Sequence, residues 1–244
     1  MSVVEKFLRR LRKVNAERSC TCDDCGTEVF DYPQTRLCDA CMSRLAYNNG
    51  YTCEKCGRAT RGEGVCLACK SNPPAFLKGA SALVYFDKTA ALVNRYKNGK
   101  RHLAYFFSEE LCACLNRLPD KPFVLVAVPL TKKKQRLRGY NQSAEIVREL
   151  AEKTGWGYRI DLLEKRSEDS QKTLTAVERR KKIVGAFRVT DRKFCKGKDF
   201  LVVDDIMTSG ATLSEIASVL MRAGAKSVCV LAVSAVPDRD PVGL

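Results

Sequence analysis

Two adjacent carboxylates open the segment of this sequence that is best suited to bind a ligand. Asp204 and Asp205 follow the hydrophobic run "FLVV", and the small loop "TSGAT" begins three residues after them. Apolar residues at helical spacing then predict a helix over 211–225. Free backbone N–H groups at a helix N-terminus bind phosphate, and carboxylates accept hydrogen bonds from sugar hydroxyls. The segment therefore predicts a site for a ribose 5-phosphate group, with Thr208, Ser209, Gly210 and Thr212 around the phosphate.

Cysteines form the second group of residues that could do chemistry. The chain has 13 of them, and eight form four C-x-x-C pairs: Cys22/Cys25, Cys38/Cys41, Cys53/Cys56 and Cys66/Cys69. Each pair presents two thiolates on one side of a turn, and two pairs complete a tetrahedral four-cysteine zinc site. Four pairs in series suit metal better than redox chemistry. Disulfides are disfavoured because no secretion signal precedes them. We expect two structural zinc ions without catalytic activity.

The pairing of these cysteines leaves two arrangements open. Sequential pairing gives a double zinc ribbon, whereas interleaved pairing has the same spacing; sequential pairing is favoured because it closes shorter loops. The segment is poor in apolar residues, so it depends on metal to fold. The extended stretch Asn72-Pro73-Pro74 marks its end. We therefore expect a separate module over 20–74, after a basic amphipathic helix over 1–19.

Residues 75–244 alternate between buried strands and helices, which predicts an α/β domain with a mostly parallel sheet. In such sheets ligands bind at the carboxyl ends of the strands, and Asp204 and Asp205 occupy that end of their strand. Asn141 is a candidate N-cap for the helix that follows it. The expected strands cover 80–86, 123–130, 158–164, 200–205 and 227–236, and the expected helices cover 89–100, 102–118, 141–155 and 211–225.

The charge and hydropathy of the chain limit its partners and location. The formal net charge is +15, and eight thiolates with two zinc ions change it by −8 + 4 = −4, to about +11. Such an excess points to polyanions, although a solvated lysine-rich surface gives the same composition. Apolar runs long enough to span a membrane do not occur in the sequence. We expect a cytoplasmic protein.

Several segments of the sequence together resemble those of a known family. "FLVVDDIMTSGATL" closely resembles the motif with which type I phosphoribosyltransferases bind 5-phosphoribosyl-1-pyrophosphate (PRPP). Together with the cysteine-rich segment, "VPLTKKKQRLRGYNQSAEI" and "SQKTLTAVERRKKIVGAF", it is similar to the ComF family over most of residues 20–235. ComF proteins are cytoplasmic, phosphoribosyltransferase-like proteins linked to DNA uptake in natural transformation. One departure is Lys182, where the family usually has asparagine.

The resemblance implies roles for particular residues. Asp204 and Asp205 would bind the ribose hydroxyls of PRPP as catalytic residues, and its 5′-phosphate would contact Thr208, Ser209, Gly210, Ala211 and Thr212. Pyrophosphate, with magnesium, would lie against a mobile basic loop that carries Lys132, Lys133, Lys134, Arg136 and Arg138. A solvated loop and a nucleic-acid contact are the other interpretations of this loop. Gln142 and Gln171 are weaker polar candidates.

Two functions remain open from the sequence. The first is a phosphoribosyltransferase with an unknown acceptor. The second is a non-catalytic competence factor that uses the same fold to bind PRPP or single-stranded DNA, for which a high positive charge and a basic loop are suited. The cysteine-rich module could also dock other DNA-uptake proteins. Fold-level similarity does not decide between these functions.

Overall fold

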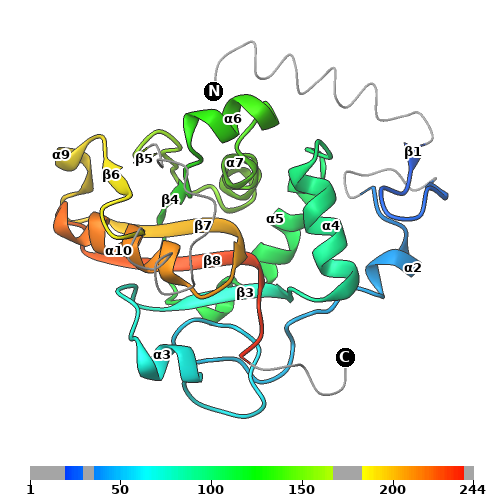
Figure 1. The fold of residues 1–244 in the computed structure, drawn as a ribbon, viewed down its shortest axis with the longest axis horizontal. Helices are drawn as coiled ribbons and strands as arrows, with labels where there is room; N and C mark the ends of the chain where they lie inside the picture. The colour runs from blue at the N-terminus through cyan, green and yellow to red at the C-terminus, as the bar shows by residue number, and fades with distance from the viewer. Residues whose placement is uncertain (1–19, 30–35, 167–182, 239–244) are drawn as a thin grey trace, which may run out of the picture. The chain divides into compact units, whose positions relative to one another are not determined.

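The computed structural model describes residues 20–29, 36–166 and 183–238 (Figure 1). Its contacts divide the chain into two compact units, Met1–Leu45 and Ala46–Leu244. The helix expected over 1–19 and the candidates Gln171 and Lys182 lie outside the described residues. The boundary expected near residue 74 remains a prediction about which segments fold independently.

The smaller unit is built from short elements around one group of cysteines. Strands β1 (Cys20–Thr21) and β2 (Glu28–Val29) pair antiparallel, and helix α2 (Asp39–Met42) follows. Gly26, in the turn between the strands, has a φ of +79°, which lets its N–H reach the carbonyl of Cys22 at 2.9 Å. The turn therefore folds back over the first cysteine pair.

The centre of the larger unit is a parallel sheet, as the alternating pattern predicts. Within the described residues it has four strands in the order β3-β8-β7-β4. Continuous burial on both faces explains why these strands read as apolar runs. The strands are β3 (Gly79–Val84), β4 (Val124–Ala127), β7 (Asp199–Met207) and β8 (Ser227–Ala235).

Helices cover both faces of this sheet (Figure 1). Helices α5 and α7 pack on one face, with α4 beside them through the Tyr96–Phe107 ring contact at 5.2 Å. Helix α10 covers the other face, where Leu213 and Ile216 join a buried cluster with Val202. The helices are α4 (Asp87–Lys97), α5 (Leu103–Ala113), α7 (Gln142–Thr154) and α10 (Ala211–Arg222).

Smaller elements complete the described part of the larger unit. They are α3 (Leu67–Ser71), the 3-10 turn η2 (Leu115–Arg117), α6 (Lys132–Arg138), β5 (Leu163–Lys165), β6 (Phe187–Val189) and α9 (Arg192–Cys195). β5 pairs antiparallel with β6. The strand expected over 158–164 is thus shorter and begins later, and the helix expected over 102–118 ends at Ala113. Among the described helices, none combines the length and hydropathy needed to cross a bilayer.

The segment with the second group of cysteines belongs to the larger unit and packs against its sheet. Gly79 donates its N–H to the carbonyl of Lys55 at 2.8 Å. A Cβ on Gly57 would lie 2.5 Å from the Cα of Ala80, so only glycine allows this backbone approach. Cys56 and its three partner cysteines share a buried cluster with Val202 and α10. This half of the cysteine-rich segment is therefore part of the core of the α/β unit.

Candidate functional site

The two carboxylates of the predicted motif lie near the carboxyl end of β7, in the interior of the sheet. Asp204 and Asp205 are 9% and 5% exposed. Ser143, in the first turn of α7, donates its hydroxyl to Oδ1 of Asp204 at 3.1 Å, and the N–H of Asp205 donates to the same oxygen at 2.9 Å. Because Asn141 caps α7 by accepting from the N–H groups of Ser143 and Ala144, it holds the Ser143 hydroxyl in place. The N-cap prediction at Asn141 is confirmed.

Asp205 has unused capacity to accept hydrogen bonds. Its Oδ2 lies 3.4 Å from Nζ of Lys97, at the end of α4. That oxygen is buried, and no described residue donates a hydrogen bond to it. Buried polar atoms are almost always hydrogen-bonded, so a carboxylate oxygen that has only this ion pair, near the end of a strand, marks a place for a hydrogen-bond donor from outside the protein. A sugar hydroxyl is such a donor.

The environment of the two acids changes their protonation. Burial, and then the negative charge of Asp205, raises the pKa of Asp204 to about 8. The hydrogen bonds from Asp205 N–H and Ser143 act in the opposite direction but are weaker. Asp204 therefore keeps its proton to a higher pH than a free carboxyl group does, and burial lowers the tendency of the pair to carry two negative charges.

The loop after β7 is exposed, in contrast to the acids. β7 ends at Met207 and α10 begins at Ala211, so residues 208–210 connect them. Gly210 stands at the N-cap position with a φ of +79°, and as a glycine it has no side chain that could accept from the helix. Ser209 Oγ accepts from Ala211 N–H at 3.3 Å. The first turn of a 12-residue helix thus offers N–H groups and its dipole to an anion.

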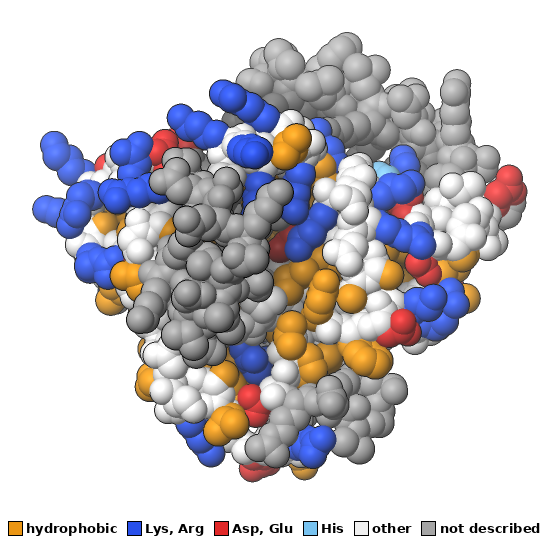
Figure 2. All heavy atoms as spheres, in the orientation of Figure 1, with side chains coloured by type: hydrophobic (Ala, Val, Ile, Leu, Met, Phe, Trp, Pro, Cys, Tyr) orange, Lys and Arg blue, Asp and Glu red, His pale blue; other side chains and the backbone are white. Residues whose placement is uncertain are grey.

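The basic segment after β4 is a helix and not the mobile loop that we expected. α6 covers Lys132–Arg138, with Thr131 accepting from Lys134 N–H at its start and left-handed Gly139 at its end. Lysine, glutamine, arginine and leucine are all good helix formers, and the two caps supply the boundaries. We misread a short, mostly polar helix as a loop because it has no buried face. Its basic side chains are mostly exposed, and Figure 2 shows Lys and Arg gathered over α6.

Sequence reasoning missed Lys97 and Ser143. Lys97 is one of several basic residues at the end of its helix, and Ser143 is an ordinary first-turn residue. Neither carries a local signal that distinguishes it. Gln142 was a weak candidate, and the structure leaves its buried Oε1 without a described donor, while its carbonyl accepts from Tyr96.

The cysteines form two clusters in sequential order among the described residues: Cys22, Cys25, Cys38 and Cys41, and then Cys53, Cys56, Cys66 and Cys69. In each cluster the sulfur atoms all lie within 4.8 Å of one another, which suits four thiolates around one zinc ion. Backbone N–H groups also point to sulfur: Cys66 N–H donates to Cys53 Sγ at 3.2 Å, and Cys38 N–H to Cys22 Sγ at 3.4 Å. The donor set and its hydrogen bonds therefore fit zinc.

Comparison with known proteins bears on the class of this domain. Residues 137–241 match the family model "Phosphoribosyl transferase domain". Among solved structures, the glutamine PRPP amidotransferase of Bacillus subtilis is similar over 56% of this chain and 26% of its own, with 19% identity and a TM-score of 0.37. The chain thus spans about a quarter of that enzyme's length. The α/β unit is a type I phosphoribosyltransferase-like domain.

Curated relatives identify the family more narrowly. The chain is 30% identical to the competence protein ComFC of Streptococcus pneumoniae, over 86% of this chain and 85% of that protein. It is 26% identical to ComFC of Bacillus subtilis (79% and 80%) and 27% identical to the DNA utilization protein YhgH of Escherichia coli K12 (80% and 94%). The chain belongs to the ComF family.

Proposed function

We propose that this protein binds PRPP at the carboxyl end of β7, where the predicted motif lies. The observation that carries the proposal is the buried Oδ2 of Asp205, which accepts no hydrogen bond from a described residue, in the strand that leads to the glycine-capped N-terminus of α10. The ribose hydroxyls form hydrogen bonds with the carboxyl groups of Asp204 and Asp205. The 5′-phosphate accepts from the loop of Thr208, Ser209, Gly210, Ala211 and Thr212.

Magnesium and the pyrophosphate group complete the proposed complex. Magnesium prefers oxygen ligands and neutralises pyrophosphate charge, and the pyrophosphate itself supplies most of the oxygens. α6 follows β4 at the same edge of the sheet as the acids, so Lys132, Lys133, Arg136 and Arg138 are candidates to attract the pyrophosphate. In a transferase, this stabilisation assists pyrophosphate as it leaves C1 of the ribose.

Calorimetric titration of PRPP with magnesium tests the binding proposal. Asp205→Asn removes a charged acceptor, so we expect a loss of about 1.5–3 kcal/mol in binding free energy. Asp120→Asn is a matched control because Asp120 is exposed and precedes β4, at the amino-terminal edge of the sheet. Equal affinity of wild type and Asp205→Asn would contradict the proposal. Exchange of labelled pyrophosphate into PRPP, with candidate acceptors, then distinguishes a transferase from a PRPP-binding protein.

A second candidate function, binding of single-stranded DNA, is favoured by the exposed basic side chains of α6. We propose that they contact phosphates without reading sequence, in a cytoplasmic role connected with DNA uptake. The smaller cysteine-containing unit is then free to dock other uptake proteins. Replacing Lys132, Lys133 and Lys134 with alanine should reduce the salt dependence of binding by roughly 1–2 in log–log slope.

The matched control for this variant is a triple alanine replacement of Lys193, Lys196 and Lys226. These exposed lysines lie near the amino-terminal ends of β7 and β8, so the variant has the same net charge but alters the opposite edge of the sheet. If the salt dependence of DNA binding falls equally in both variants, the protein attracts DNA only through its net charge and not through α6. Absence of DNA binding by wild type at low salt would leave PRPP binding as the proposed function.

A further inference from the structure

A buried arginine connects the second cysteine cluster to the loop that we propose binds phosphate. Arg58 is only 5% exposed. Its Nε donates to Sγ of Cys56 at 3.3 Å, and its Nη2 donates to the carbonyl of Thr208 at 2.8 Å. One planar guanidinium therefore contacts a candidate zinc ligand and the first residue of the loop at the same time.

The charges of the two partners explain why an arginine is buried there. Four thiolates around one zinc ion carry about −4 + 2 = −2, and burial of that charge is costly unless a cation lies nearby. The guanidinium supplies the cation, and its rigid fork fixes the direction of the second donor. The hydrogen bond to Thr208 thus depends on a guanidinium that the cysteine site holds in place.

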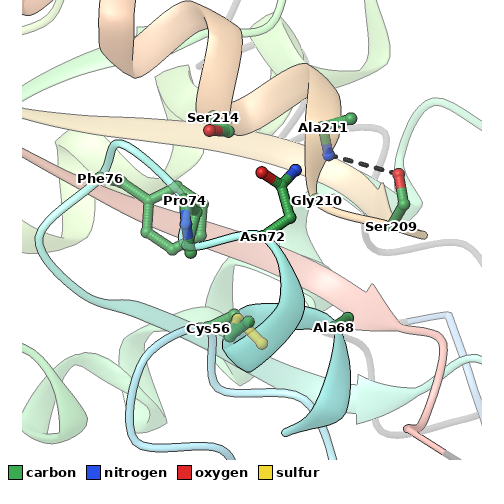
Figure 3. Close-up of a pocket in the computed structure, with 10 residues that line it drawn as sticks. Cys56, Ala68, Asn72, Pro74, Phe76, Ser209, Gly210, Ala211 and Ser214 are labelled. Carbon is green, nitrogen blue, oxygen red and sulfur yellow. Dashed lines mark hydrogen bonds between the residues drawn. The ribbon is translucent and has the colours of Figure 1, made fainter. Parts of the chain in front are cut away.

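A further contact crosses the same boundary. Ala75 N–H, just after the cysteine-rich segment, donates to Ser214 Oγ in the first turn of α10 at 3.0 Å. Figure 3 shows the small pocket between the two regions, with Cys56 and Asn72 on one side and Ser209 and Ala211 on the other. The loop therefore rests on the cysteine segment as well as on its own strand.

We propose that Arg58 is a positioning residue that couples the second cysteine site to the phosphate loop. Metal in the cluster of Cys53, Cys56, Cys66 and Cys69 orders the loop through the guanidinium and so raises the affinity for PRPP. This inference rests on the proposed function and adds to it a second site, the metal site, whose occupancy changes the affinity for PRPP. By linkage, PRPP must then also strengthen metal retention at this cluster by the same factor.

The first cysteine cluster provides an internal control. In the first cluster, Thr27 is the second residue after the pair Cys22/Cys25. Arg58 occupies the same position after the pair Cys53/Cys56. Arg44 also donates to a cluster sulfur, Cys41 Sγ, at 3.0 Å, but it is half-exposed and belongs to the smaller unit. Arg44→Met therefore removes an arginine–thiolate contact in the other cluster.

The test compares zinc-loaded wild type, Arg58→Met, Arg58→Lys and Arg44→Met. Hydrogen exchange of peptides over 207–216 reports the order of the loop without any ligand. We expect faster exchange there in Arg58→Met, an intermediate rate in Arg58→Lys, and no change in Arg44→Met or in peptides over 227–235. Unchanged exchange in Arg58→Met, with both zinc ions retained, would overturn the inference. If Arg58→Met does not fold, Arg58→Lys decides by the same criterion.

Two titrations measure the coupling itself. PRPP affinity should fall at least about fivefold in Arg58→Met and stay unchanged in Arg44→Met. In wild type, PRPP should slow the transfer of zinc to a chelator from one of the two cysteine sites, the second. In Arg58→Met, PRPP should no longer slow this transfer. If wild type and Arg58→Met bind PRPP tightly and with equal affinity, the proposed coupling is overturned, whereas the proposed function stands. If wild type does not bind PRPP, the proposed function fails, and the exchange experiment still decides whether Arg58 orders the loop.

Discussion

Nζ of Lys97 lies 3.4 Å from Oδ2 of Asp205, although the two residues belong to a helix end and a strand interior far apart in the sequence. The Asp205 side chain is 6% exposed and the Lys97 side chain 21%. The ammonium compensates a carboxylate that has little access to water. Removal of one partner should therefore leave an uncompensated charge.

Lys97→Met should lower the free energy of unfolding by about 1–3 kcal/mol for this reason. The double variant Lys97→Met/Asp205→Asn should regain most of the loss, because it no longer buries an unpaired charge. Urea denaturation measures both. Lys88→Met, at an exposed position of the same helix, is the control and should change stability by less than about 0.5 kcal/mol. Strictly additive losses in the double variant would contradict the pairing.

The stability of the protein should depend on pH through Asp204. Its pKa is raised to about 8, so the folded protein keeps a proton that the unfolded chain releases near pH 4. Between these values the folded state binds more protons, and the free energy of unfolding falls as pH rises. The free energy of unfolding of Asp204→Asn, measured by urea denaturation, should fall less than that of wild type between about pH 5 and pH 8. Asp161→Asn should follow wild type in this range, and parallel curves for all three proteins would refute the assignment.

Metal analysis should give two equivalents of zinc per chain, since two four-cysteine clusters are present among the described residues. A separate module over 20–74 that depends on metal, as the sequence predicts, would unfold alone on loss of a ligand such as Cys56. Packing of that cluster in the core of the larger unit leads to a different expectation. Cys56→Ser should destabilise the α/β unit, whereas Cys38→Ser should not. Circular dichroism during thermal unfolding checks this, and equal melting of the two variants would refute it.

Gly57 and Gly26 form a matched pair, because each follows a C-x-x-C turn with a positive φ. Alanine at Gly26 would meet nothing within 4 Å, so only the left-handed backbone opposes it, at about 1 kcal/mol. Alanine at Gly57 would in addition place Cβ 2.5 Å from the Gly79 carbonyl oxygen. Gly57→Ala should therefore cost more than about 3 kcal/mol in denaturant unfolding, since backbone must shift. A similar loss of stability in both variants would mean that the backbone at Gly57 is not in close contact with β3.

Much of this protein could be predicted from its sequence, because the decisive signals are local. The C-x-x-C spacing places two sulfur atoms within one turn, and Asn141 caps a helix through bonds to the next few residues. A buried strand followed by acids and "TSGAT" likewise specifies strand, loop and helix in order. The alternation of apolar segments was enough to predict the parallel sheet. The helix α6 was missed because its pattern lacks an apolar face.

The partners of these residues were decided only by the tertiary structure. Ser143 reaches Asp204 across 61 residues, and Arg58 reaches Thr208 across 150. Parallel strand order and helix packing bring such residues together, and no short-range periodicity records those contacts. For the same reason the second cysteine cluster lies in the core of the α/β unit, although its composition resembles that of the first. Local chemistry specifies which groups can bind a ligand, whereas long-range packing determines their charge state and what holds them in place.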